Sequence, residues 1–85
     1  MVEGYAQLRG FLYYHTWRSD HSAAGFPDYV LTRNGRLVFA ELKRVGAKTT
    51  PRQREWLWAL AECLGPGHVF LWTVREWPQA IEVLR

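Results

Sequence analysis

The sequence has only one cysteine, Cys63, and no run of about 18 apolar residues. A single cysteine excludes an internal disulfide, and a cysteine-based zinc site would need other ligands. The chain opens without the basic segment and long apolar stretch of a secretory signal, so neither export nor membrane insertion is expected. We therefore expect a cytoplasmic protein in a reducing compartment, with no membrane partner.

The sequence also lacks internal repeats, low-complexity tracts and linkers. Its 85 residues can close only one hydrophobic core, which predicts a single domain over residues 1–85. The composition, 48% hydrophobic and 22% charged, is typical of a globular chain. Five tryptophans, four tyrosines and four phenylalanines are more than so small a core hides, so some rings are expected at an interface.

The chain carries a small excess of positive charge. The net charge is +3 and the pI about 9.4, from eleven lysines and arginines against eight acids. This balance is compatible with a phosphate-rich partner and equally with an ordinary basic surface. The candidate phosphate contacts, each with the alternative of a solvated side chain, are Arg18, Arg33, Arg36, Arg44, Lys48, Arg52 and Arg54.

Local patterns predict most of the secondary structure. Residues 2–14 carry apolar side chains at helical spacing and predict a short helix that runs into a strand over 11–16. Asn34-Gly35 is the favoured pair of a type I′ turn and lies between two β-prone segments, 29–32 and 37–40, so a hairpin is expected there.

The second half of the chain predicts a helix, a strand and a final helix. Thr50-Pro51-Arg52-Gln53 has the form of a capping box, and the helix it starts ends at Gly65-Pro66-Gly67. The apolar segment 69–74 is expected to be an interior strand parallel to the second hairpin strand, and 78–84 a short helix. The predicted fold is α/β, a small mixed sheet flanked by helices in the order helix, hairpin, helix, strand, helix.

The hairpin register brings two acidic residues together. Counting outward from Asn34-Gly35, Arg33 faces Arg36, and five pairs further along Asp28 faces Glu41. Their Cβ atoms are then about 4.5–5.5 Å apart. Strand alternation places Lys43 on the face of Glu41, whereas Leu42 points away with its backbone carbonyl near the site.

Two facing carboxylates repel each other by on the order of 4 kcal/mol at an effective dielectric of 20. A divalent cation such as Mg²⁺ or Mn²⁺ removes that repulsion, because it binds one or two carboxylates together with waters and phosphate oxygens. Lys43 would then position a water or stabilise developing charge. A purely structural cluster, in which Glu41 pairs with Lys43 and Asp28 caps a loop, explains the same residues.

Several of these segments resemble one known family. Gly25-Phe26-Pro27-Asp28, Phe39-Ala40-Glu41-Leu42-Lys43 and Thr50-Pro51-Arg52-Gln53 with Trp56-Leu57 after it are similar to the VRR-NUC domain (virus-type replication-repair nuclease) of the PD-(D/E)XK superfamily. The likeness extends through Tyr14-His15-Thr16 and Ser22 to the strand near Trp72. It implies a restriction-endonuclease-like fold and a metal-dependent deoxyribonuclease.

The resemblance also implies roles for individual residues. Asp28 and Glu41 would bind Mg²⁺ or Mn²⁺, with the Leu42 carbonyl as a further ligand, while Lys43 and Gln53 would assist catalysis. Gln53 can equally serve only the helix cap. In that family a glutamate on the first helix completes the metal site, and here only Glu3 is available, with a solvated side chain as the alternative.

The likeness implies partners as well. Standalone members of the family are expected to form homodimers and to cut branched DNA, such as Holliday junctions or flaps, during phage or bacterial replication and repair. A homodimer also suits Trp56 and Trp58, because one helix cannot bury both in a monomer of this size. Endonucleolytic and exonucleolytic action are both open.

Two histidines and an acid raise the possibility of a transition-metal site. His15, Asp20 and His21 have no fixed helical spacing, so a polar loop is the better interpretation, with His15 able to face the nuclease site. Three functions remain at this stage. They are a metal-dependent nuclease, a non-catalytic nucleic-acid-binding or nuclease-accessory module on the same fold, and a purely structural dimerisation domain.

Overall fold

The hairpin predicted from Asn34-Gly35 is the centre of the fold. In the computed structural model, which describes residues 2–16 and 23–85, β2 (Tyr29–Arg33) and β3 (Arg36–Leu42) pair antiparallel. The φ angles are 51° at Asn34 and 80° at Gly35, as a type I′ turn requires. The pairs run from Arg33 opposite Arg36 to Tyr29 opposite Ala40, which confirms the predicted register.

The hairpin belongs to a mixed sheet in the order β1-β2-β3-β4. β1 (Leu12–His15) is antiparallel to β2, and β4 (Val69–Trp72) is parallel to β3, as predicted. The prediction that the late apolar strand is interior is wrong, because β4 lies at an edge of the described sheet. Its apolar side chains are covered unevenly: Trp72 is 2% exposed and Leu71 45%.

The helices also follow the predictions. α1 is Val2–Leu8, α2 is Pro51–Leu64, and α3 is Trp77–Val83, preceded by the 3-10 turn Val74–Glu76. α2 begins with the expected capping box, in which the Thr50 side chain accepts from the Gln53 N–H and the Gln53 side chain accepts from the Thr50 N–H. No helix of the described residues is long and apolar enough to cross a membrane.

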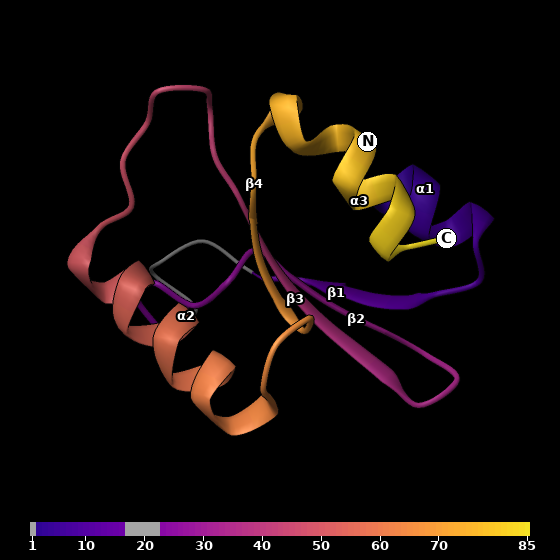
Figure 1. Cartoon of the computed structure of the whole chain (residues 1–85), viewed down its shortest axis with the longest axis horizontal. Coiled ribbons are helices and arrows are strands. Elements are labelled where there is room, and N and C mark those ends of the chain that lie inside the picture. The colour runs from indigo at the N-terminus through magenta and orange to yellow at the C-terminus, as the bar shows by residue number, and fades with distance from the viewer. Residues whose placement is uncertain (1, 17–22) are drawn as a thin grey trace.

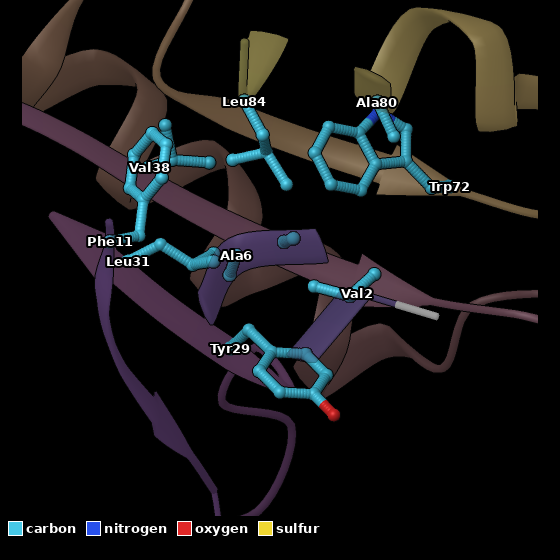
Figure 2. Close-up of a cluster of buried hydrophobic side chains, with 10 residues drawn as sticks. Val2, Ala6, Phe11, Tyr29, Leu31, Val38, Trp72, Ala80 and Leu84 are labelled. Carbon is cyan, nitrogen blue, oxygen red and sulfur yellow. The ribbon is translucent and has the colours of Figure 1, made fainter. Parts of the chain in front are cut away.

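The sheet separates two helical layers of unequal packing. Figure 1 shows α1 and α3 together on one face and α2 on the other. The main core lies between α1, α3 and the sheet (Figure 2), and its buried members are Val2, Ala6, Phe11, Tyr29, Leu31, Val38, Ala40, Trp72, Ala80 and Leu84. By contrast, no residue of α2 is fully buried.

The loop that precedes β2 packs between the sheet and α2. Phe26 packs edge to face against Phe39 of β3 at 6.0 Å and against Trp56 of α2 at 4.9 Å between ring centroids. Gly25 lies so close to the backbone of Arg52 that a methyl group in place of its Cα hydrogen would have no space. These contacts fix the Pro27-Asp28 segment against the first turn of α2.

Candidate active site

Glu41 is the buried acid at the end of the central strand. Alternation along β3 directs Ala40 and Leu42 towards the α1/α3 core, and Glu41 to the opposite face, towards α2. Glu41 is only 3% exposed, and it is the one buried charged residue of the described ranges. A carboxylate in that position needs specific partners, because burial without them is costly.

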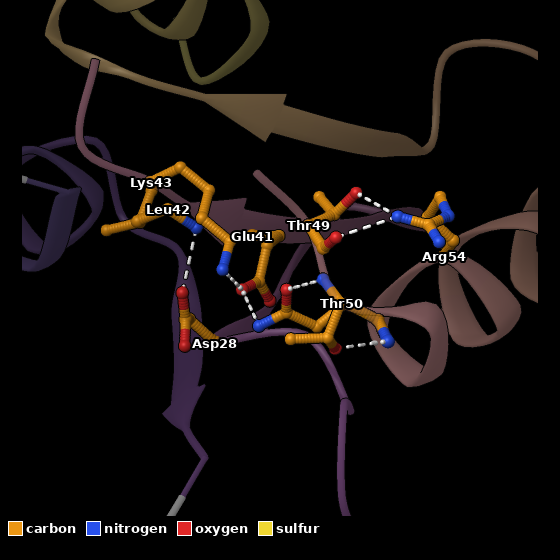
Figure 3. A network of polar contacts seen from close by, with 8 residues as sticks. Asp28, Glu41, Leu42, Lys43, Thr49, Thr50 and Arg54 are labelled. Atoms are coloured by element: carbon orange, nitrogen blue, oxygen red, sulfur yellow. Dashed lines mark hydrogen bonds and ion pairs between the residues drawn. The ribbon is translucent and has the colours of Figure 1, made fainter. Parts of the chain in front are cut away.

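Asp28 lies just before β2, one position beyond the last hairpin pair. Its Oδ2 accepts a hydrogen bond of 2.8 Å from the Leu42 backbone N–H, and its carbonyl accepts one of 2.8 Å from the Thr16 N–H. If the hairpin register is extended by one pair beyond Tyr29 and Ala40, Asp28 faces Glu41, and the Asp28 charge raises the pKa of Glu41. The structure thus brings the two predicted carboxylates to the same end of the sheet (Figure 3).

Lys43 and the Leu42 peptide complete this end of β3. The Lys43 Nζ lies 4.0 Å from Glu41 Oε2, which confirms that both side chains occupy one face. The Lys43 backbone N–H donates to the Trp72 carbonyl of β4 at 2.9 Å. Because a trans peptide directs its N–H and C=O oppositely, the Leu42 carbonyl points away from β4, towards the Asp28 side. Its role as a ligand stays a prediction.

Gln53 serves the helix cap and the acid simultaneously. Its Oε1 accepts from the Thr50 N–H at 2.8 Å, while its Nε2 donates to Glu41 Oε2 at 3.0 Å. The predicted cap is therefore confirmed, and Gln53 also contacts Glu41, while its catalytic role stays a prediction. The capping box fixes the side chain, so that its remaining amide donor is aimed at the buried carboxylate.

The electrostatics of Glu41 are unusual. Burial and the neighbouring Asp28 carboxylate raise the pKa of Glu41 to about 7, against smaller opposing effects of Lys43 and of a hydrogen bond with the Asp28 backbone. Without a further cation, Glu41 is therefore partly protonated at neutral pH. A carboxylate with a pKa in this range is suited either to cation binding or to proton transfer.

Glu3 contacts Tyr29, the residue that follows Asp28 in the chain. Glu3 Oε2 accepts a hydrogen bond of 2.6 Å from the Tyr29 hydroxyl and lies 3.4 Å from His15 Nδ1. Desolvation and Glu3 raise the pKa of Tyr29, so its hydroxyl remains a donor. Residues 2–16 and 23–85 contain no cluster of three or more His, Cys, Asp or Glu side chains. The ligand role of Glu3 stays a prediction.

The remaining candidates fall in different places. His15 stacks on Tyr29 at 4.5 Å between ring centroids, on the sheet face opposite to Glu41. Asp20, His21 and Arg18 lie outside the described residues.

The candidate phosphate contacts are divided between the two ends of the hairpin. Arg33 and Arg36 flank the turn, about 17 Å from the Asp28 end at 3.4 Å per residue. Arg33 donates to the carbonyls of Arg9 and Arg85. Exposed side chains nearer the site belong to the loop after β3 and the first turn of α2, namely Arg44, Lys48, Arg52 and Arg54.

The sequence did not predict that Tyr29 binds Glu3, nor that Tyr29 lines a cavity. A cavity of about 200 Å³ opens at the carboxyl ends of β3 and β4, lined by Val2, Tyr29, Leu42, Lys43, Trp72, Thr73, Val74 and Trp77. The only local signal was the position of Tyr29 directly after Asp28. Lys43 belongs both to the cavity and to the acidic site.

Comparison with known protein families, curated proteins and solved structures gives no match.

The double role of Gln53 gives a testable expectation. Replacement by methionine removes the donor to Glu41 and the capping acceptor together, so we expect the Glu41 pKa to rise further and the helix cap to lose about 1 kcal/mol. NMR titration of the Glu41 carboxyl measures the first effect and urea unfolding the second. Gln7→Met, on exposed α1 surface, is the control. An unchanged Glu41 pKa would contradict the contact.

Proposed function

We propose that the protein is a metal-dependent nuclease that hydrolyses phosphodiester bonds of DNA. The proposal is supported chiefly by one observation, the buried Glu41 opposite Asp28 with Lys43 and Gln53 directed at it. A structural cluster would not need to bury an acid next to another acid, where its charged form is disfavoured. The α/β fold and the sequence resemblance to VRR-NUC domains agree with this assignment.

The residues fit a hard divalent cation. Asp28 and Glu41 would supply carboxylate oxygens, and the Leu42 carbonyl, which points towards the Asp28 side, would supply a third oxygen from the protein. Mg²⁺ or Mn²⁺ uses few protein ligands and completes its shell with water and phosphate, so three or more acidic side chains are not required. The bound cation would neutralise the phosphate and lower the pKa of a coordinated water.

The protein's own groups then perform distinct tasks. Hydrolysis needs a water to attack phosphorus while the bond to the leaving oxygen breaks. Lys43 Nζ, next to Glu41, is placed to orient that water or to stabilise charge on the phosphoryl oxygens. Gln53 holds the Glu41 carboxylate in position, and the Leu42 N–H holds that of Asp28.

The proposed substrate is DNA with a branch or flap, as the resemblance implies. Exposed basic side chains at the loop after β3 and the start of α2 are suited to phosphate contacts that do not read sequence. The net charge of +3 favours association with any nucleic acid at low salt. Replication or repair in a phage or bacterium is the setting that the resemblance suggests.

The decisive experiment compares labelled four-way junction, flap and plain duplex with Mn²⁺, Mg²⁺ or EDTA. We expect metal-dependent cleavage, with preference for the branched substrates. Asp28→Asn should lower it on the order of 10²–10³-fold, while the folded state persists because the Asn side-chain oxygen still accepts from the Leu42 N–H. Glu82→Gln, an exposed acid on α3, is the matched control. Full activity of Asp28→Asn would refute the proposal.

The same assay separates the alternative functions. A non-catalytic nucleic-acid-binding or nuclease-accessory module would bind DNA in a salt-dependent manner and yield no metal-dependent product. A purely structural dimerisation domain would show neither binding nor cleavage.

A further inference from the structure

The cavity of about 200 Å³ lies where the chain divides beyond the sheet. β3 and β4 are parallel neighbours whose last residues, Leu42 and Trp72, pair with each other and both line the cavity. The chain that leaves β3 continues to α2 on one face of the sheet, whereas the chain that leaves β4 continues to α3 on the other (Figure 1). The two connections therefore diverge at the carboxyl ends of these strands, which is the usual position of a ligand site in an open α/β sheet.

The walls of this cavity are mainly aromatic and aliphatic. The side chains of that kind are Val2, Tyr29, Leu42, Trp72, Val74 and Trp77. Figure 2 shows three of them, Val2, Tyr29 and Trp72, which come from α1, β2 and β4. Rings of β2, β4 and α3 therefore border one space.

The polar side-chain atoms of these walls already have partners within the chain. The Tyr29 hydroxyl donates to Glu3 at 2.6 Å, and the Trp72 indole N–H donates to Gln79 at 3.0 Å. The Thr73 hydroxyl, which also lines the cavity, donates within its own turn. These walls therefore offer an occupant apolar contact and ring stacking rather than side-chain hydrogen bonds.

Lys43 joins the cavity to the candidate active site. It lines the cavity, and its Nζ lies 4.0 Å from Glu41 Oε2. Successive phosphates of one strand are only about 3.4 Å apart along the axis of a duplex, so a nucleotide whose phosphate contacts Lys43 has the cavity within its reach. The group that such a nucleotide brings to an apolar, ring-lined space is its base, because every base has a flat face that stacks on aromatic side chains.

We infer that this cavity holds the base of one unpaired nucleotide beside the scissile phosphate. The inference rests on the proposed nuclease function and deepens it, because it names the kind of nucleotide that is cut. Pockets for drug-sized ligands measure about 300–1,000 Å³, so a cavity of about 200 Å³ suits a single base.

Two properties of the substrate follow from this site. A base inside a duplex must first be extruded, which costs least where the base is already unpaired. Flaps, bulges and single strands should therefore be cut in preference to the fully paired arms of a junction. The identity of the base should matter little, because stacking reads no pattern of hydrogen bonds.

Substrates that lack a single base test the occupant. A set of labelled flaps carries one abasic residue at each position around the cleaved bond, and cleavage by the full chain is measured with Mn²⁺ or Mg²⁺. We expect cleavage about 10-fold slower at one position next to the scissile phosphate, as the loss of one stacked base implies. Difluorotoluene, an apolar group with the shape of thymine, should restore the rate there. Equal rates for every abasic position would overturn the inference.

A ring added at the mouth of the cavity tests the location. Val74 lines the cavity and is 66% exposed, so Val74→Trp narrows the opening from the solvent side. The variant should cut the intact flap about 10-fold more slowly than the wild type, yet cut the sensitive abasic flap at the wild-type rate, which shows that it is folded. Leu8→Trp, which adds the same ring to exposed surface of α1, should behave as the wild type. A Val74→Trp variant that still distinguishes the two flaps would refute this location.

Binding in EDTA separates this inference from the nuclease proposal. The same flaps are titrated with wild-type protein and followed by fluorescence anisotropy, and one abasic position should weaken binding about 10-fold. If the wild type binds in this base-dependent manner but cuts nothing with either metal, the nuclease proposal fails and the base site stands. If it cuts DNA with no regard to the missing base, the base site fails and the nuclease proposal stands.

Discussion

Glu41→Gln is expected to stabilise the metal-free protein above pH 7 while it abolishes cleavage. The pKa of Glu41 is about 7 in the folded protein and 4.5 in an unfolded chain. A raised folded pKa means that the folded state binds the extra proton, so this contribution to stability is complete below pH 4.5 and is lost as the pH rises through 7. The loss is on the order of 3 kcal/mol when Glu41 is fully ionised.

Glutamine removes that titration and preserves the shape of the side chain. Thermal unfolding in EDTA should show that the wild type loses stability between pH 5 and pH 8, whereas Glu41→Gln loses much less. Mg²⁺ or Mn²⁺ should restore the wild type at pH 8 and have little effect on the variant, because a ligand stabilises only the state that binds it. Glu82→Gln again serves as control.

The activity of Glu41→Gln should fall on the order of 10³-fold or more. Glu41→Gln is thus expected to raise stability and to lower activity. These opposite signs distinguish a functional acid from a structural one, since removal of a structural ion-pair partner destabilises the protein. A variant that is inactive and also less stable than the wild type at pH 8 would assign Glu41 to fold maintenance. Unchanged cleavage would exclude it from catalysis.

Among substitutions that add a single methyl group, Gly25→Ala is expected to destabilise the protein most. Gly25 has φ of 83°, and a Cβ there would lie 2.5 Å from the Arg52 backbone carbon and 2.7 Å from its carbonyl oxygen. The left-handed conformation costs alanine about 1–2 kcal/mol. Relief of the contact with rigid backbone costs a further 1–3 kcal/mol. Urea unfolding should therefore show a loss of about 2–5 kcal/mol.

Gly35→Ala provides a matched control for this effect. Gly35 has φ of 80°, nearly the same as Gly25, but an added Cβ meets nothing within 4 Å. It should lose only the conformational contribution, about 1–2 kcal/mol. Gly25→Ala should also reduce cleavage, because separating the loop from α2 displaces Asp28 relative to Glu41 and Gln53. Equal losses of unfolding free energy in the two variants would show that the close approach of residue 25 to the Arg52 backbone does not affect stability.

The sequence predicted the elements whose causes are local. Asn34-Gly35 dictates a turn with two positive φ angles, and that turn alone sets which residues face each other along the hairpin. The capping box likewise depends on four consecutive residues, Thr50 to Gln53. For this reason the approach of Asp28, Glu41 and Lys43 was predictable without knowledge of the remaining fold.

Other features depend on residues far apart in the chain. The apolar residues of β4 suggested an interior strand, yet composition reports burial on the faces of a strand and not whether another strand pairs with its edge. Glu3 could not be assigned to Tyr29, 26 residues away, because helix α1 must first pack on the sheet. The contacts of Arg33 with the carbonyls of Arg9 and Arg85 have the same origin.

The sequence by itself therefore determined the paired acids, the lysine on their face and the start of the helix beside them. The tertiary structure decided how deeply Glu41 is buried, that the spare amide donor of Gln53 reaches it, and that Glu3 binds Tyr29. The physical reason is that turn chemistry and strand alternation act over a few residues, whereas desolvation depends on which elements pack together. The burial of Glu41 beside Asp28, on which the proposed function depends most, is a product of that packing, and the raised pKa of Glu41 follows from it.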